Sequence, residues 1–393
     1  MPNEDILDIY NRPRPLEGTN IVEIGTSVAG PYAGWVLAAL GATVTKIERL
    51  GRGDDIRQWG PPFWRETSTM FHTYNRGKKS LELDLKNPSS TDKLRKWIIS
   101  EADVVLQNLK PGVVERASLD AKKLCAENSR LIYCNVRAYG DEGPLKDQPG
   151  YDPLMQAFSG LMSVTGENDE RPVRIGTSII DKGTGLWCVI GILTMLERRH
   201  RTGRGGVVDT SLLETALGWM SFHVTDLYAT GETPSAEGSG VRGIAPYQAY
   251  RCVDGYLVVA AANDRLFEAL VGVLGHPDWA LDPRFITNPD RYTNLEALNA
   301  LVEPIFSAKE IEFWQKKLSK AGVPCAPVQT LDEVVKHEQV VALGIVEKSD
   351  TEGIPMVGLP LNFDNHRPPP ASNAPKLGSH NDIFESFKEK DKT

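Results

Sequence analysis

The fold class is decided by the segment Asn20-Ile21-Val22-Glu23-Ile24-Gly25, by residues 31–40 and by Thr43-Val44-Thr45-Lys46-Ile47-Glu48. The first and last of these runs are rich in apolar and β-branched residues, which is typical of buried strands. Pro31 suits the first turn of a helix between them, and Gly41 ends that helix. A strand, a helix and a second strand in this order predict a right-handed βαβ unit with parallel strands.

The same alternation continues along the N-terminal half. Asp103-Val104-Val105-Leu106 and Leu131-Ile132-Tyr133-Cys134-Asn135-Val136 are again β-rich, and a helical pattern separates them. Repeated βαβ units predict an α/β domain in which helices cover a parallel sheet. We therefore expect a Rossmann-like large domain over residues 1–215.

The pattern changes near Thr230. Residues 231–243 are rich in Gly, Ser and Glu, which predicts a mobile loop, and residues 247–262 predict two strands around the turn Asp254-Gly255. Residues 264–274 and 294–318 have helical patterns. These features predict a smaller α+β domain over residues 225–330, followed by a C-terminal segment, residues 331–393, that returns to the large domain.

Composition limits the classes of function. The chain has 393 residues and a formal net charge of −8, which argues against nucleic-acid binding because that needs basic surfaces. Five cysteines without a C-x-x-C pair indicate reduced thiols. The first residues lack a secretory pattern, and the strongly apolar stretch of residues 185–196 is too short to span a bilayer. We expect a soluble, cytoplasmic protein with no membrane partner.

The first βαβ unit raises the question of a dinucleotide site. Glu48 ends the second strand where a ribose-binding acid would lie. However, Gly25, Gly30 and Gly34 do not have the G-x-G-x-x-G spacing and are better explained by a tight turn and close helix–sheet packing. The sequence also lacks a Walker A motif, a G-x-S-x-G motif and histidines at metal-ligand spacing. An NAD oxidoreductase remains a weak alternative.

Motifs spread along the chain carry a family resemblance. They are Val28-Ala29-Gly30-Pro31, Lys46-Ile47-Glu48-Arg49, residues 75–80 and 83–86, Asn108, Pro111-Gly112, Arg116, residues 149–153, 159–160, 165–166, 175–185 and 202–205, Pro246-Tyr247-Gln248, Asp254-Gly255-Tyr256 and residues 322–328. In this order they resemble the class III CoA-transferase family. That family includes formyl-CoA, carnitine and succinyl-CoA transferases and the α-methylacyl-CoA racemases.

The resemblance implies that Asp181 is a covalent nucleophile. Asp181 follows Ile179-Ile180 and precedes a long apolar helix, so partial burial and helix N-terminal amides could make its carboxylate reactive. A simple helix cap is the structural alternative. In the family, the aspartate forms an acyl anhydride and then an aspartyl–CoA thioester. Coenzyme A enters as a substrate, and no tightly bound cofactor or metal is implied.

The remaining site residues are also carried over by position. The resemblance assigns CoA contacts to Ala29, Arg49, Leu83, Lys86, Asn108, Leu109 and Arg116. Tyr151 is expected to contact the thioester or pantetheine, and Asp152 to orient Asp181 or a backbone amide. Gly240, Arg242 and Gly243, in the loop of residues 238–243, are the candidates for oxyanion and substrate binding. Packing and turn roles remain open for each of these residues.

Departures from the family pattern guide the choice of substrate. The racemases have His where Tyr151 stands, and a phenol is a poor proton shuttle at neutral pH. The formyl-CoA:oxalate branch has Gln in place of Val28 and four glycines in place of residues 240–243. Arg242 and Arg174 could pair with the distal carboxylate of a dicarboxylic acid. We expect a CoA-transferase that uses succinyl-CoA and a C4 to C6 dicarboxylate, with a racemase-like enzyme or a non-catalytic acyl-CoA binder as alternatives. The resemblance also implies an interlocked homodimer.

Overall fold

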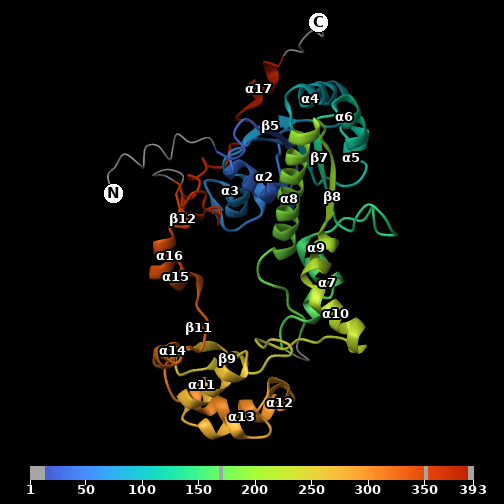
Figure 1. The fold of residues 1–393 in the computed structure, drawn as a ribbon. Coiled ribbons are helices and arrows are strands. Elements are labelled where there is room, and N and C mark those ends of the chain that lie inside the picture. The colour runs from blue at the N-terminus through green and yellow to red at the C-terminus, as the bar shows by residue number, and fades with distance from the viewer. Residues whose placement is uncertain (1–13, 168–170, 349–352, 388–393) are drawn as a thin grey trace. The chain divides into compact units, whose positions relative to one another are not determined.

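A computed structural model describes residues 14–167, 171–348 and 353–387 (Figure 1). The described chain forms two compact units. The first contains the described parts of residues 1–161, 174–225 and 341–393, and the second contains those of residues 162–173 and 226–340. We describe each unit by itself.

A six-stranded parallel sheet forms the centre of the first unit. Its spatial order is β5-β2-β1-β6-β7-β8, and the strands are β1 (Asn20–Ile24), β2 (Thr43–Arg49), β5 (Lys79–Leu83), β6 (Val104–Gln107), β7 (Ile132–Arg137) and β8 (Gly206–Ser211). The predicted α/β class with a parallel sheet is confirmed. β5 and β8 were not predicted as strands, because Lys, Ser, Glu, Asp and Thr interrupt their short apolar patterns.

The strand order reverses between β1 and β6. The chain passes from β1 outward to β2 and β5, and it then crosses back to β6, β7 and β8. In open parallel sheets, ligands bind beyond the carboxyl ends of the strands at such a switch point. The loops that follow β1 and β6 are therefore the first place to look for a site.

The helices of this unit pack against the sheet and against one another. They are α2 (Ala29–Ala39), α3 (Thr69–Asn75), α4 (Pro88–Glu101), α5 (Val113–Arg116), α6 (Ala121–Glu127), α7 (Asp152–Phe158), α8 (Ile179–Thr202) and α9 (Leu212–Trp219), with the 3₁₀ turns η1 (Asp55–Gln58) and η2 (Leu161–Ser163), the latter crossing the unit boundary. α2 begins two residues before Pro31, at the end of a loop that Val28 closes. α8 packs on α2 and on β7 and β8 (Figure 1).

Short elements complete the first unit. The hairpins are β3 (Phe63–Trp64) with β4 (Thr67–Ser68), and β12 (Val346–Glu347) with β13 (Met356–Val357). α17 (Asn381–Glu385) lies beside edge strand β5 (Figure 1). There the His380 N–H donates to the Ser80 carbonyl at 3.0 Å, and the Glu82 N–H donates to Asn381 Oδ1 at 2.9 Å. These bonds occupy backbone groups of edge strand β5 that could otherwise pair with a strand of another chain.

α8 is longer than its apolar sequence predicted. Within the described residues it is one helix whose length and composition would allow it to cross a membrane, although half of its most apolar window is buried inside the protein. The expectation that this apolar segment is too short to span a bilayer was therefore wrong, because the helix extends beyond residues 185–196 at both ends. One side of α8 packs against the sheet and α2, while Leu186, Trp187, Ile190 and Leu193 remain exposed.

The second unit contains a three-stranded antiparallel sheet and a helical layer. The strands are β9 (Tyr247–Arg251), β10 (Tyr256–Ala260) and β11 (Cys325–Pro327), in the order β11-β10-β9. The helices are α11 (Asp264–Leu274), η3 (Pro277–Leu281), α12 (Asn288–Thr293), α13 (Leu295–Phe306), α14 (Ile311–Lys320) and α15 (Leu331–Val334). α10 (Ser221–Thr230) and α16 (Glu338–Leu343) cross the boundary between the units.

The helix expected over residues 294–318 is two helices. α13 ends at Phe306, and α14 begins at Ile311, whose N–H donates to Asp254 Oδ1 at 2.9 Å. The Trp314 indole N–H then returns to the Phe306 carbonyl at 3.0 Å. The break lets both helices pack their apolar faces into one core with Tyr250.

Candidate active site

Asp181 lies in the first turn of α8 and is partly buried. The N-cap residue of this helix, Ser178, makes no side-chain capping bond. Instead, Asp152 Oδ2 accepts from the N–H groups of Ile180 at 2.8 Å and Asp181 at 3.1 Å. Asp152 is buried at the start of α7. The carboxylate of one helix therefore caps the neighbouring helix, which fixes the position of Asp181.

Gln156 holds this cap in place from one turn along α7. Its Nε2 donates to Asp152 Oδ1 at 2.5 Å, and its Oε1 accepts from the Ile175 N–H at 2.9 Å. The predicted partner of Asp152 was either Asp181 or a backbone amide, and the bonds formed are to backbone amides.

The electrostatics of Asp181 follow from this arrangement. Burial, reinforced by the negative charge of Asp152, raises the pKa of Asp181 to about 7. We expected the amides of α8 to stabilise the charge of Asp181, and that expectation was wrong because two of those amides bind Asp152. Near neutral pH the Asp181 carboxyl group is therefore divided between its acid form and a poorly solvated, nucleophilic anion.

Glycines let α8 approach its neighbours closely. A β-carbon at Gly185 would lie 2.9 Å from the Ala29 carbonyl oxygen and 2.9 Å from Tyr32 Cδ1. A β-carbon at Gly183 would lie 2.6 Å from the Trp219 ring. Gly185 is four residues after Asp181 and shares its helix face. The start of α8 is thus pinned between α2 and α9, and Asp181 lies on the side of the α2 N-terminus.

The loop between β1 and α2 is tied to the loop after β6. The Thr26 N–H donates to Asn108 Oδ1 at 2.7 Å, and Asn108 Nδ2 donates to the Thr26 carbonyl at 2.8 Å. β-Carbons at Gly25 or Gly30 would each lie 3.3 Å from the Asn108 side chain. Asn108, a predicted CoA contact, thus uses its amide to hold the two loops together at the switch point.

A buried ion network supports the same loop. Lys46 Nζ contacts Glu23 Oε1 at 2.8 Å, Asp54 Oδ2 at 2.9 Å and the Gly25 carbonyl at 2.7 Å. Asp54 Oδ1 accepts from the N–H of Ser27, whose φ of 66° is in the left-handed region. These bonds stabilise a backbone conformation that a serine rarely adopts.

Glu48, the residue considered for a ribose, is occupied by protein groups. Both of its oxygens accept from Arg57, at 2.8 and 2.7 Å, and Oε1 also accepts from Ser80 Oγ at 2.6 Å. Burial opposes its ionisation, but the bonds from Arg57 and the neighbouring positive charges lower the pKa of Glu48 to about 2. This buried ion pair argues against the dinucleotide alternative.

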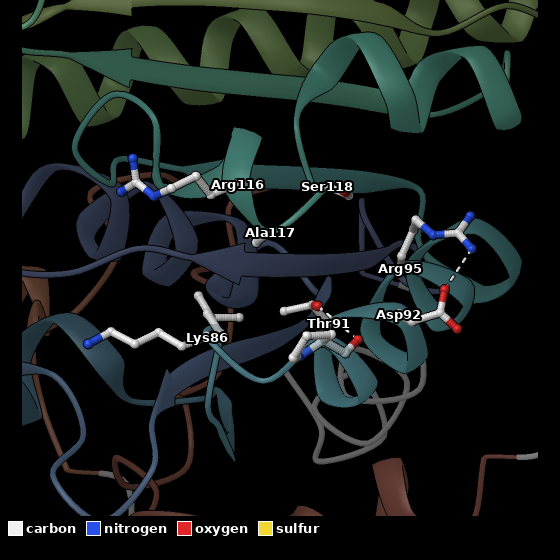
Figure 2. A pocket seen from close by; sticks show the side chains of 9 residues that line it. Lys86, Thr91, Asp92, Arg95, Arg116, Ala117 and Ser118 are labelled. Atoms are coloured by element: carbon white, nitrogen blue, oxygen red, sulfur yellow. Dashed lines mark hydrogen bonds and ion pairs between the residues drawn. The ribbon is translucent and has the colours of Figure 1, made fainter.

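Two predicted CoA contacts meet at one pocket. The pocket has a volume of about 250 Å³ and is lined by Lys86, Arg116, Thr91 and Arg95, among others. Figure 2 shows the Lys86 and Arg116 side chains extending to the same side, whereas Arg95 turns to Asp92 at 2.8 Å. In the described parts of the chain, Lys86 and Arg116 have no acidic partner. The pair can therefore bind a phosphate group.

The other predicted CoA contacts have varied surroundings. Arg49 is half exposed, forms an ion pair with Asp55 and donates to the Gly53 carbonyl at 3.2 Å. Leu83 is buried at the end of β5, and Leu109 packs at the margin of the same core. Ala29 is buried at the start of α2. Arg49 and Leu83 are the last residues of β2 and β5, and Ala29 and Leu109 follow β1 and β6, so all four lie at or beyond the carboxyl ends of sheet strands.

Tyr151 precedes Asp152 and is half exposed. Its ring lies edge-on to Trp59, with 6.5 Å between centroids. Trp59 was not predicted as a site residue. The sequence does contain one indication of its role, because Trp59 is a large aromatic residue directly before the turn residues Gly60-Pro61-Pro62, in the connection that follows a sheet strand.

The predicted glycine loop belongs to the second unit. The Gly240 N–H donates to the Glu237 carbonyl at 2.8 Å, and Gly243 has a φ of 76°. Arg242 contacts Glu237 Oε1 at 3.2 Å and Asp226 Oδ2 at 3.4 Å. Arg174 belongs to the first unit, where its guanidinium donates to the Ile175 carbonyl at 2.9 Å.

Comparison with known proteins places this geometry in context. The sequence profile of CoA-transferase family III matches residues 16–381. An acetyl-CoA:oxalate CoA-transferase of Acetobacter aceti is 35% identical over 92% of the chain and 93% of the relative. A succinate–glutarate CoA-transferase of Agrobacterium fabrum is 33% identical over 95% of each chain. The crystal structure of a CaiB/BaiF family protein from Brucella suis has a TM-score of 0.84 at 36% identity, over 95% of this chain and 99% of that one.

Proposed function

The chain belongs to CoA-transferase family III and is a CoA-transferase, and from this premise we propose that Asp181 carries the acyl and CoA groups during transfer. The donor is succinyl-CoA or a similar dicarboxylyl-CoA. The acceptor is a dicarboxylic acid of four to six carbons.

The reaction is a sequence of carbonyl substitutions. An oxygen of ionised Asp181 bonds to the thioester carbon, and the carbon–sulfur bond breaks to give a mixed anhydride and the CoA thiolate. The thiolate then attacks the Asp181 carbonyl, which releases the donor acid and leaves an aspartyl–CoA thioester. The acceptor carboxylate repeats these steps in reverse order. One thioester replaces another, so the exchange needs no external energy source.

The observation that carries the proposal is the environment of Asp181. Its carboxyl group is partly buried, its pKa is raised to about 7, and within the described residues it makes no hydrogen bond. A carboxylate that served only as a helix cap would bind the helix amides, and here Asp152 does so instead. Asp181 is therefore available for a substrate.

The CoA-binding proposal rests on the carboxyl edge of the sheet. Lys86 and Arg116 are the cations proposed for the phosphates. Ala29 at the start of α2, Leu83 at the end of β5, and Asn108 and Leu109 after β6 are proposed as further contacts along the same edge of the sheet. Tyr151 is proposed to contact the pantetheine arm. Arg49 would have to exchange its ion pair with Asp55 for a phosphate.

The choice of a dicarboxylate rests on Arg242 and on the relatives. Gly240, Arg242 and Gly243 are proposed to bind the oxyanion and the distal carboxylate, and Arg242 would exchange Asp226 or Glu237 for the substrate. The succinate–glutarate and acetyl-CoA:oxalate enzymes act, by their names, on dicarboxylic acids. The racemase alternative has less support, because Tyr151 replaces its histidine.

A trapping experiment tests the covalent step. The enzyme is incubated with succinyl-CoA and then with hydroxylamine or borohydride, and its peptides are analysed by mass spectrometry. We expect modification at Asp181. The Asp181→Asn variant should remain unmodified, whereas the matched control Asp55→Asn, which keeps Asp181, should still be modified at Asp181. A protein that binds CoA but remains unmodified would be the non-catalytic binder, and loss of the α-proton without transfer would indicate the racemase.

A panel of donors and acceptors tests the substrates. Succinyl-CoA, acetyl-CoA and the CoA thioester of carnitine are each offered with oxalate, succinate and glutarate. Transfer from acetyl-CoA or the carnitine thioester without transfer from succinyl-CoA would exclude the proposed donor.

We also propose that the enzyme is a cytoplasmic homodimer. α8 leaves Leu186, Trp187, Ile190 and Leu193 exposed in a stripe at helical spacing. Apolar stripes of this kind are typical of surfaces that a partner covers. Sedimentation velocity should give a dimer, and Trp187→Glu with Ile190→Glu should give monomers.

A further inference from the structure

Two tyrosines lie on the α2 and α3 side of the nucleophile. Tyr32 is on α2 and Tyr74 is on α3, and their rings meet edge to face with 6.1 Å between centroids. Tyr74 is buried in a cluster with Val28 and Ile56. Neither tyrosine was predicted as a site residue, because a tyrosine within a helical pattern predicts only packing.

The packing of α8 places this pair near Asp181. Tyr32 is in contact distance of Gly185, which lies one turn below Asp181 on the same helix face. Burial and then the charge of Asp181 raise the pKa of Tyr74 to about 12. Burial alone raises the pKa of Tyr32. Of the two phenols, the Tyr74 hydroxyl is the one that the charge of Asp181 reaches.

The Tyr74 hydroxyl is available as a donor. Within residues 14–167, 171–348 and 353–387, it makes no hydrogen bond, and the Asp181 carboxyl group makes none either. The Tyr74 ring is buried, whereas its hydroxyl oxygen remains accessible to water. An anionic oxygen that forms next to Asp181 would take the place of that water as the acceptor.

The site also needs a donor from outside α8. Two carboxylates, Asp152 and Asp181, lie at the start of this helix, and the amides of residues 180 and 181 are bound to Asp152. When Asp181 adds to the thioester carbonyl, its negative charge moves to the carbonyl oxygen of the tetrahedral intermediate, which needs a hydrogen-bond donor. Stabilising that charge is among the largest contributions to acyl-transfer catalysis.

We propose that Tyr74 is a further catalytic residue, whose hydroxyl donates a hydrogen bond to the oxyanion that forms when Asp181 adds to the thioester carbonyl. This inference rests on the proposed function. As the Asp181 oxygen bonds to the carbonyl carbon, the π electrons of the carbonyl move to its oxygen. When the intermediate collapses, the carbonyl re-forms and the thiolate leaves. Tyr74 keeps its proton throughout.

The test compares two identical changes on the paired rings. Tyr74→Phe removes only the hydroxyl oxygen, and Tyr32→Phe is the matched control. For Tyr74→Phe we expect kcat to fall about 10- to 100-fold, with the KM for succinyl-CoA changed less than about threefold. The formation of the Asp181 adduct in a single turnover should slow by the same factor as kcat. Tyr32→Phe should keep kcat within about threefold of the parent enzyme.

The outcomes separate this inference from the proposed function. If Tyr74→Phe keeps its full kcat while Asp181→Asn is inactive, the catalytic role of Tyr74 is wrong and the nucleophile stands. An equal loss in Tyr32→Phe would also overturn the inference, because it would show a packing effect. The acidic limb of the pH–rate profile should keep its position in Tyr74→Phe, since removing a neutral phenol leaves the charges around Asp181 unchanged. A shifted limb would contradict the proposed role.

Discussion

Replacing Asp181 with asparagine should abolish transfer and, at the same time, stabilise the fold at alkaline pH. The physical reason is that Asp181 is ionised in a place that disfavours its charge. Burial and Asp152 raise its pKa from 3.8 to about 7. The folded protein therefore holds this proton more tightly than the unfolded chain, and ionisation of Asp181 costs folding free energy.

The magnitude and the pH window follow from that shift. A difference of about three pKa units corresponds to about 4 kcal/mol at about 1.4 kcal/mol per unit. The cost is absent below pH 3.8, where both states are protonated, and it grows as pH rises. It is complete above about pH 7. At pH 8 the free energy of unfolding of Asp181→Asn should exceed that of the parent enzyme by up to about 4 kcal/mol. At pH 4 the two proteins should differ by less than about 1 kcal/mol.

Urea denaturation followed by circular dichroism at pH 4 and pH 8 measures both differences. Asp152→Asn is the matched control, since Asp152 accepts three hydrogen bonds, from Ile180, Asp181 and Gln156. That variant should lose about 1 to 3 kcal/mol. A gain for Asp181→Asn that is equal at the two pH values, or no gain at pH 8, would refute the reasoning about the charge.

Three further predictions test the site. Because only ionised Asp181 attacks, kcat should fall about tenfold per pH unit below about pH 7 and level off above it in steady-state assays; a flat profile down to pH 5 would contradict this. Lys86→Met and Arg116→Met should each raise the KM for succinyl-CoA about 10-fold and leave kcat within about twofold. The Arg95 guanidinium is already paired with Asp92, so Arg95→Met should change neither constant. Equal effects of all three variants would contradict the assignment of Lys86 and Arg116 to a phosphate. Gly185→Ala should lower kcat and destabilise the protein by about 1 to 3 kcal/mol, because the added β-carbon would lie 2.9 Å from the Ala29 carbonyl oxygen. In Gly272→Ala on α11 the added β-carbon meets nothing within 4 Å, so the thermal unfolding temperature of this control should stay the same or rise.

The sequence by itself determined the class of the fold. The runs that became β1, β2, β6 and β7 are rich in apolar and β-branched residues, because both faces of a parallel sheet are buried. Local alternation of such runs with helical patterns leaves few topologies. The sequence also predicted that Asp181 begins a long helix, since apolar residues follow it at once.

The pairing of polar groups was decided by the tertiary structure alone. Asp152 caps α8 by accepting from the Asp181 amide, which is 29 residues away in sequence. Asn108 accepts from the Thr26 amide in the loop after β1, which is 82 residues away. Residue types name what a side chain can bond, but only the packed chain selects its partner. The pKa of Asp181 depends on solvent that the fold removes and on a second carboxylate that the fold brings near. The neighbourhood of Tyr74 arises in the same way, because three helices distant in sequence meet there.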